Sequence, residues 1–264
     1  MVSKAFPIAQ MIVLAGLALS STAWGATCSN ASLNGTYGFL HDGTASTGAP
    51  ATAAITQITF DSATGTFRGE TIASHDGVIA TQSLTGTYTV ASDCTGTGTP
   101  AAGSPFSIVV TSRAFLAVHP FSEGFAVKQG SPTCTNAAVI GSFGFEATGV
   151  FLPGAPATGW VAFIGELKLT VTASGEGVIS GHVAGSEGGT ALTFAPVTGS
   201  YKVDTDCRGT ATITPQDQSP LNFSFVVVDY GKEMLGIDAD AYTVVSGTLV
   251  RDDHGDRELP PNGS

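Results

Sequence analysis

The sequence predicts an all-β protein of two tandem antiparallel β-barrels, and three observations support this prediction. First, the segment Cys28–Phe39 returns nearly unchanged as Cys134–Phe145, about a hundred residues later, a spacing typical of a duplicated domain. Second, no stretch after the N-terminal segment keeps the apolar spacing of an amphipathic helix over three turns. Third, short runs rich in Val, Thr, Ile and Phe alternate with turn residues throughout the chain.

Two further pairs of segments support the duplication. Leu84–Thr97 returns as Val197–Thr210, and the short stretch Gly48–Thr52 returns as Gly154–Thr158. We therefore divide the chain into a signal peptide, a first repeat, a second repeat and a flexible tail. Their bounds are 1–25, 26–131, 132–252 and 253–264.

Candidate strands follow from runs of β-favouring residues between turns. In the first repeat we expect seven strands, at 34–41, 52–60, 66–74, 78–90, 106–111, 113–118 and 123–128. In the second repeat we expect eight, at 139–146, 158–172, 177–184, 190–203, 209–214, 221–229, 233–238 and 242–251. Segments 75–77 and 229–232 are expected hairpin turns, since Asp and Gly tolerate a left-handed backbone.

The alternation within the strands and their number favour a small closed barrel. In the first strand, for example, Tyr37 and Phe39 fall on one face. Seven or eight such strands close a barrel whose interior holds side chains or one small ligand. An immunoglobulin-type β-sandwich is the alternative fold. It is less favoured because Cys28 precedes the first strand and no tryptophan lies between Cys28 and Cys94.

The N-terminus has the pattern of a secretory signal peptide. Lys4 supplies a positive charge, Ile12–Leu19 supplies a short apolar core, and small residues favour cleavage after Gly25. No apolar run is long enough to span a bilayer as a helix. We therefore expect an exported protein, periplasmic or extracellular, without a membrane span.

Cysteine usage agrees with an oxidising compartment. The four cysteines stand at equivalent places in the two repeats, which favours the disulfides Cys28–Cys94 and Cys134–Cys207. Four cysteines allow three pairings, and a crossed pairing between the repeats stays open at this point. No Cys-x-x-Cys motif occurs, so no zinc site or other metal site is predicted.

Charge and motifs exclude several classes of function. Ten lysine and arginine residues stand against 21 aspartate and glutamate residues, a formal net charge of −11. A chain this acidic lacks the basic patch that a nucleic-acid partner requires. Nucleophile-elbow, phosphate-loop and His-Glu-x-x-His motifs are also missing from the sequence, so neither a catalytic residue nor a cofactor is predicted.

Polar and aromatic residues within strands are the candidate ligand-binding residues. Arg68 and Glu70 share one face of a predicted strand, and Glu166 and Lys168 do the same in the second repeat. These pairs would orient a ligand if they pointed inward, whereas an outward position would make them a surface ion pair. The repeated aromatics Tyr88 and Tyr201 complete this set of candidates, although core packing is the alternative role for both.

Three single histidines are predicted to face solvent. They are His41, His119 and His182.

The repeated motifs resemble those of a known group of proteins. Cys-x-x-Ala-Ser-Leu-x-Gly-Thr-Tyr-Gly-Phe followed by the Leu84–Thr97 segment resembles exported, acidobacterial-type bacterial proteins of unknown function with an allene-oxide-cyclase-like barrel domain. Phe225–Glu233 resembles a late part of that module, whereas Ile108–Arg113 lacks its charged turn. The resemblance implies a calycin-like barrel in each repeat, and it transfers no catalytic residue to this chain.

Three functions are compatible with these observations. The favoured one is a non-enzymatic exported protein that binds a small apolar ligand or acts as an interaction module of the cell envelope. The first alternative is a cofactor-free cyclase or isomerase that holds a lipid-like substrate within a barrel. The second alternative is a structural surface or matrix protein. The sequence does not predict an oligomeric state.

Overall fold

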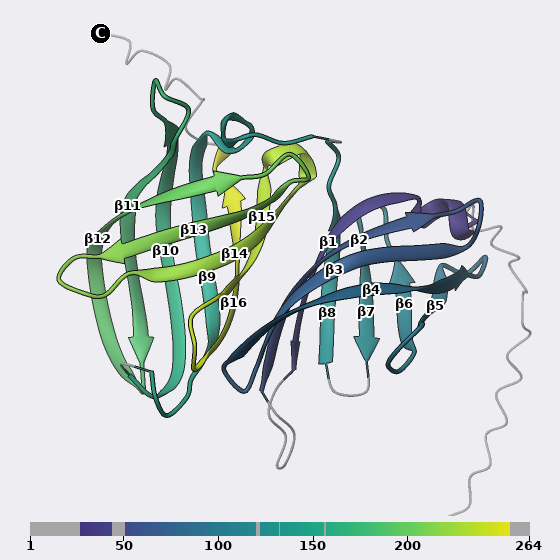
Figure 1. Ribbon diagram of the computed structural model, residues 1–264, viewed down its shortest axis with the longest axis horizontal. Helices are drawn as coiled ribbons and strands as arrows, with labels where there is room; N and C mark the ends of the chain where they lie inside the picture. Colours follow the sequence, from purple (N-terminus) through teal and green to yellow (C-terminus); the bar gives the residue numbers. More distant parts are fainter. Residues whose placement is uncertain (1–26, 44–50, 120–121, 132, 156, 254–264) are drawn as a thin grey trace, which may run out of the picture.

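The computed structural model confirms the predicted fold class. It describes residues 27–43, 51–119, 122–131, 133–155 and 157–253, which form two closed antiparallel barrels of eight strands each (Figure 1). A closed ladder of strands excludes the sandwich alternative. The expected signal peptide and most of the expected tail lie outside the described residues. Among the described residues, no helix has the length and apolar character needed to cross a membrane.

Barrel 1 is formed by the strands of the first repeat, each paired with the next and β8 with β1. The strands are β1 (Gly35–Gly43), β2 (Thr52–Asp61), β3 (Thr66–His75), β4 (Val78–Val90), β5 (Thr95–Pro100), β6 (Phe106–Val110), β7 (Ala114–His119) and β8 (Ser122–Lys128). The expectation of seven or eight strands in a closed barrel is confirmed, although β5 was missing from the seven candidate strands. Its sequence of Thr, Gly and Pro carries no apolar alternation, yet it pairs with both β4 and β6.

Barrel 2 repeats this order with β9 closing against β16. Its strands are β9 (Gly141–Phe151), β10 (Gly159–Val171), β11 (Gly177–Glu187), β12 (Thr190–Val203), β13 (Arg208–Pro215), β14 (Leu221–Val228), β15 (Glu233–Asp238) and β16 (Thr243–Arg251). All eight were predicted, and the largest error at a strand end is five residues, at the end of β9.

A short 3-10 helix closes one end of each barrel. In barrel 1 this helix is η1 (Asn30–Leu33), and its fully buried Leu33 packs with Tyr37, Phe60 and Phe115 in the interior. In barrel 2 the equivalent helix is η2 (Asn136–Val139), whose Val139 is fully buried as well. The opposite end of barrel 1, where β1 and β3 finish and β2 and β4 begin, is called the mouth below.

Both expected disulfides are present. Cys28 is bonded to Cys94 and Cys134 to Cys207, so the crossed pairing is excluded. Each bond ties the segment before the 3-10 helix to the β4–β5 or β12–β13 turn, and therefore fastens the closed end of its barrel.

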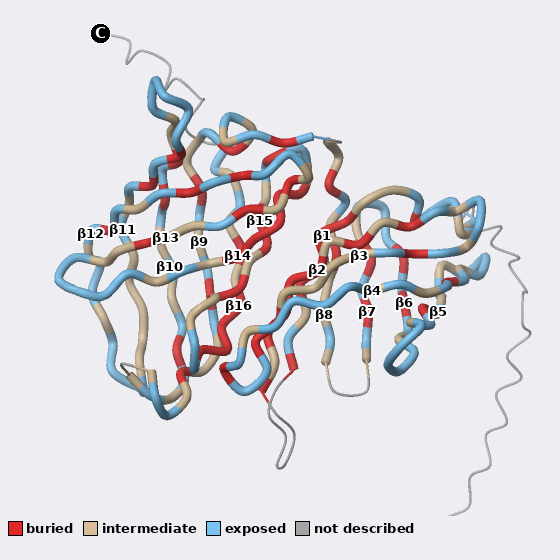
Figure 2. Tube along the Cα trace, viewed as in Figure 1, coloured by how far each residue is buried: buried red, intermediate tan, exposed pale blue. Residues whose placement is uncertain are grey.

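The two barrels pack side by side through the outer faces of β1–β3 and β14–β16. Figure 2 shows buried residues concentrated where these strands meet. Leu40 and Ile55 of barrel 1 pack there with Val228, Leu235 and Ile237 of barrel 2. Apolar residues on the outer face of these strands are thereby covered, so the duplicated halves share a second core.

Tight turns join the barrels near the mouth of barrel 1. The predicted hairpin turn between β3 and β4 contains Asp76 and Gly77, with φ of 49° and 75°. The Gly77 carbonyl accepts a hydrogen bond from the Tyr242 amide at 2.9 Å. A Cβ at Gly77 would lie 2.4 Å from the Cα of Tyr242, so this contact requires glycine. Ser74 adds a hydrogen bond from its hydroxyl to the Thr243 carbonyl.

Candidate functional site

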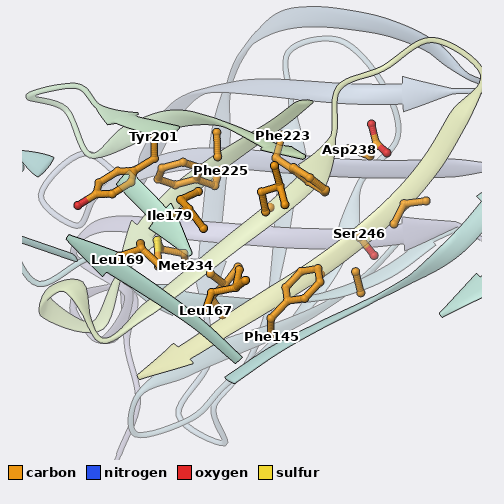
Figure 3. A pocket seen from close by; sticks show the side chains of 17 residues that line it. Phe145, Leu167, Leu169, Ile179, Tyr201, Phe223, Phe225, Met234, Asp238 and Ser246 are labelled. Carbon is orange, nitrogen blue, oxygen red and sulfur yellow. The ribbon is translucent and has the colours of Figure 1, made fainter. Parts of the chain in front are cut away.

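The interiors of the two barrels differ in volume. The cavity of barrel 1 measures about 320 Å³ and reaches the mouth. The cavity of barrel 2 measures about 40 Å³ and is lined almost entirely by apolar side chains, including Phe145, Leu167 and Phe225 (Figure 3). Barrel 1 therefore has room for a small organic molecule, whereas the space in barrel 2 is of the order of one or two waters.

Small residues predominate among the inward positions at the mouth of barrel 1. The row of inward residues nearest the mouth begins at His41 on β1, which lies opposite Ala54 on one side and Gly124 on the other. The same row continues through Ala73 on β3 and Ala117 on β7. Four of these five positions carry at most one side-chain carbon, and His41 is the only large residue of the five.

The equivalent row of barrel 2 is just as rich in small residues, but its one large residue stands on a different strand. The small residues are Ala147, Gly185, Gly236 and Gly247, and the large one is Phe163 on β10. Ala147 replaces His41, and Phe163 replaces Ala54. Phe163 packs with Phe151 and Val161, and together they close the end of barrel 2 that corresponds to the mouth. Phe163 therefore places an aromatic ring at the end of barrel 2 that corresponds to the open mouth of barrel 1.

Histidines surround the cavity of barrel 1 at its mouth. His41, His75 and His119 all line it, from β1, β3 and β7. The expectation that His41 and His119 face solvent was wrong, because both continue the inward alternation of their strands, His41 directly after Tyr37 and Phe39. His182 does lie exposed, on the outer face of barrel 2.

His41 has the most perturbed environment of the three. Its ring stacks on Phe39, with centroids 5.0 Å apart and planes 18° apart. Burial, followed by the charges of His119 and His75, lowers the pKa of His41 from 6.5 to about 4. His41 is therefore a neutral imidazole at neutral pH, and it makes no side-chain hydrogen bond within the described residues.

We expect His41 to make the protein less stable in acid. The unfolded chain binds a proton at the ordinary pKa of 6.5, while the folded protein resists it down to about 4. The unfolded state therefore holds more protons between these values, and stability falls as pH decreases through this window, by up to about 3 kcal/mol. His41→Ala, which copies Ala147 of barrel 2, should remove this part of the pH dependence of urea unfolding.

The exposed His182 provides the matched control. His182→Ala should leave the change of unfolding free energy between pH 7 and pH 4 as it is in the native protein. Both variants keep the titratable groups that face His41, which are His75, His119 and the rim residue Glu123. An unchanged slope in His41→Ala would show that the cavity wall does not perturb this imidazole.

The charged candidates from the sequence lie on outer faces. Arg68 and Glu70 point away from the interior of barrel 1, opposite the buried Phe67. Glu166 and Lys168 do the same around the buried Leu167 of barrel 2, and both are exposed. None of the four lines either barrel cavity.

Glu70 takes part in the contact between the barrels. Its carboxylate pairs with the guanidinium of Arg208, which also contacts Asp206 at 2.8 Å. Gln129 donates to the Asp206 carbonyl at 2.9 Å, and Gln57 donates to the same oxygen. Glu70 therefore has a partner from the other barrel, in place of the Arg68 partner that the sequence suggested.

Tyr88 and Tyr201 lie at the closed ends of the barrels. The hydroxyl of Tyr88 donates to the Asn30 carbonyl at 3.0 Å, and that of Tyr201 donates to the Asn136 carbonyl at 3.0 Å. Burial is the main reason why the pKa of Tyr88 rises to about 12. Tyr201 also borders the small cavity of barrel 2, whereas Tyr88 does not line the cavity of barrel 1.

Asp238 is a buried carboxyl group of barrel 2, at the position that corresponds to His119. It is 2% exposed, and its burial raises its pKa to about 6. Its carboxylate accepts a hydrogen bond from the Asp240 amide at 2.8 Å. This bond shapes the loop that presents Tyr242 to barrel 1, which gives Asp238 a structural partner.

Among the described residues, no group of three or more His, Cys, Asp or Glu side chains is arranged to hold a metal ion. The three mouth histidines are polar groups of the cavity wall.

Comparisons with known proteins add little to this geometry. No family model matches the chain, and no curated protein matches it. One solved structure, a DUF3598-family protein of unknown function from Nostoc punctiforme, aligns with 84% of this chain and 97% of its own. The identity is 10% and the TM-score 0.27, values that support no inference about function.

Proposed function

We propose that this chain is an exported, non-enzymatic binding protein that holds one small molecule in the mouth of barrel 1. The observation that carries the proposal is the 320 Å³ cavity of barrel 1, which contrasts with the filled interior of barrel 2. A largely preformed, mostly apolar hollow with a few polar groups is the usual form of a small-molecule site. In this proposal barrel 2 is a structural partner that supports barrel 1.

Export and barrel type are part of the same proposal. The two disulfides suit an oxidising compartment, in agreement with the signal peptide expected from the sequence. The resemblance of the repeated motifs to allene-oxide-cyclase-like barrel proteins supports a calycin-like barrel with a ligand at one end.

Filling the cavity tests this function. Ala117 lines the cavity on β7, and Ala117→Phe should occupy it much as Phe163 occupies barrel 2. Native mass spectrometry of the protein from its own host should show a small molecule that is lost on denaturation, and the variant should lack it.

The neighbouring residue supplies the control for this variant. Leu116 points outward from the same strand and is 51% exposed, so Leu116→Phe adds an aromatic ring without filling the barrel. This control should keep the small molecule. Retention of the molecule by Ala117→Phe, or its absence from the native protein, would contradict a ligand site in barrel 1.

One observation favours catalysis as a second candidate function. His41 is a half-buried, neutral imidazole facing the cavity, and such a group is suited to removing a proton from a bound molecule. A cofactor-free isomerase or cyclase is the corresponding reaction class. If this second candidate holds, the molecule retained by His41→Ala should differ in structure, at the same mass, from the one retained by the native protein.

A further inference from the structure

The cavity of barrel 1 has two chemically different walls. These walls are seen in the row of inward residues next to the row of His41, on the side away from the mouth. Each residue of this row pairs with the next one on the neighbouring strand. The row runs through Phe115, Ala126, Phe39, Thr56, Thr71 and Gln82. Strands β7 to β1 supply its apolar half, and strands β2 to β4 supply its polar half. β3 and β7 are four strands apart in a barrel of eight, so the two halves face each other.

The apolar half presents aromatic rings. Phe39 stacks against Phe115, with centroids 5.6 Å apart and planes 30° apart, and on His41 at the mouth. Phe106 lines the same cavity from β6. A wall of stacked rings favours a flat ring compound over a flexible chain, because ring contacts add to the stabilisation from burial alone.

The polar half has unused hydrogen-bonding capacity. The Thr56 and Thr71 hydroxyls are 2.7 Å apart and bond to each other, so the one that accepts keeps its own hydrogen free to donate. Gln82 lines the cavity from an exposed position at its edge, and its amide offers both donors and an acceptor. A ligand with a hydroxyl, carbonyl or amide group would satisfy these groups.

Barrel 2 provides an internal comparison for this row. The equivalents of Thr56, Thr71 and Gln82 are Gly165, Val183 and Ala195, which have no side-chain polar atoms. The duplicated fold therefore forms without a polar half at this level, so these three side chains are not required for closing a barrel.

The charges around the cavity restrict the ligand further. No lysine or arginine lines it among the described residues, and Glu123 lies at its rim. A buried carboxylate without a cationic partner is costly, so an anionic ligand is disfavoured. We infer that barrel 1 binds an uncharged, flat ring compound that carries a hydroxyl, carbonyl or amide on one edge. The ring contacts Phe39, Phe106 and Phe115, and the polar group reaches Thr71 and Gln82. This inference rests on the proposed function.

Isothermal titration with four probes tests the inference on the two-barrel protein with both disulfides intact. The probes are 2-naphthol, naphthalene, 2-naphthoate and 1-decanol, used at pH 7.5. 2-Naphthol should bind about tenfold or more tightly than 2-naphthoate, because the cavity offers no cationic partner for a carboxylate. It should also bind about tenfold or more tightly than 1-decanol, because decanol has no ring to contact the aromatic wall.

A double variant isolates the polar half. Thr71→Val with Gln82→Ala copies Val183 and Ala195 of barrel 2. It should weaken naphthol about tenfold through the loss of one or two hydrogen bonds, and it should leave naphthalene within about twofold. An equal effect on both probes would overturn the inference, because the polar groups would then not contact the ligand.

The failure of the inference differs from the failure of the proposed function. Binding that Ala117→Phe abolishes, but that favours decanol or naphthoate, would overturn the ligand class and keep the site. No binding of any probe, or binding that Ala117→Phe leaves intact, would overturn both.

Discussion

Replacing Cys134 and Cys207 together by alanine should lower the free energy of unfolding by about 5 kcal/mol, the largest effect we expect from any pair of residues. The disulfide closes a loop with a sequence separation of 73 residues. Removing a cross-link of this span costs about 4 kcal/mol through the greater freedom of the unfolded chain. The remainder comes from lost packing, since the two cysteines are 3% and 0% exposed in the core of barrel 2.

The disulfide of barrel 1 is the matched control. Cys28 and Cys94 are separated by 66 residues, so the contribution from the unfolded chain is nearly the same, at about 4 kcal/mol. Both cysteines are only half-buried, and replacing them with alanine removes less packing. Urea unfolding of the two double variants should therefore differ by about 1 kcal/mol. Equal losses would show that burial of the second bond adds nothing.

The Cys134–Cys207 disulfide also lies next to the contact between the barrels, which is a second reason to expect a large loss of stability when it is removed. Asp206 and Arg208 flank Cys207, and both take part in the hydrogen bonds and ion pairs that reach Gln129 and Glu70. Loosening the turn around Cys207 should weaken this contact as well.

Local patterns predicted most of the fold because alternation and turns are local properties. Tyr37 and Phe39 mark the inward face of β1, and Asp76 and Gly77 mark the turn that follows β3. The disulfide pairing followed from the duplication. Strand β5 was missed since its Thr-Gly alternation shows no apolar face, and its pairing with β4 and β6 is a property of the closed barrel.

The candidate site was predicted less well, and the reason is physical. A histidine at a strand end gives no sign of its direction until the alternation of the whole strand is extended to it. Tyr37 and Phe39 were already placed on one face, and continuing by two residues would have placed His41 inside. Barrel 1 has Ala54 where barrel 2 has Phe163, a difference that only the pairing of strands brings into view.

The contact between the barrels left a partial signal in the sequence. Strand β15 carries Met234, Leu235 and Ile237, so both of its faces are apolar, which is typical of a strand buried on both sides. Its partner strands could not be predicted, because the contact joins residues such as Glu70 and Arg208 that are distant in sequence.

Leu235→Ala should lower the free energy of unfolding by about 3 kcal/mol, because it leaves a cavity in the core shared by the barrels. Leu235 is 0% exposed, although it points outward from barrel 2, and it packs with Leu40 and Ile55 of barrel 1. An outward residue of an isolated barrel would be exposed, and its truncation would cost little. The size of the loss therefore measures whether the two barrels unfold as one unit.

Leu116→Ala is the same chemical change at an outward position that no other barrel covers. Leu116 is 51% exposed on β7, and its truncation should change stability by no more than about 0.5 kcal/mol. Urea unfolding of both variants, followed by circular dichroism, makes the comparison. If Leu235→Ala cost no more than Leu116→Ala, the barrels would be independent in solution. A loss near 3 kcal/mol would instead mean that barrel 2 stabilises barrel 1 through the core that they share. The contacts at the mouth agree with such support, because Tyr242 of barrel 2 donates a hydrogen bond to the β3–β4 hairpin of barrel 1 and Thr243 accepts one from it.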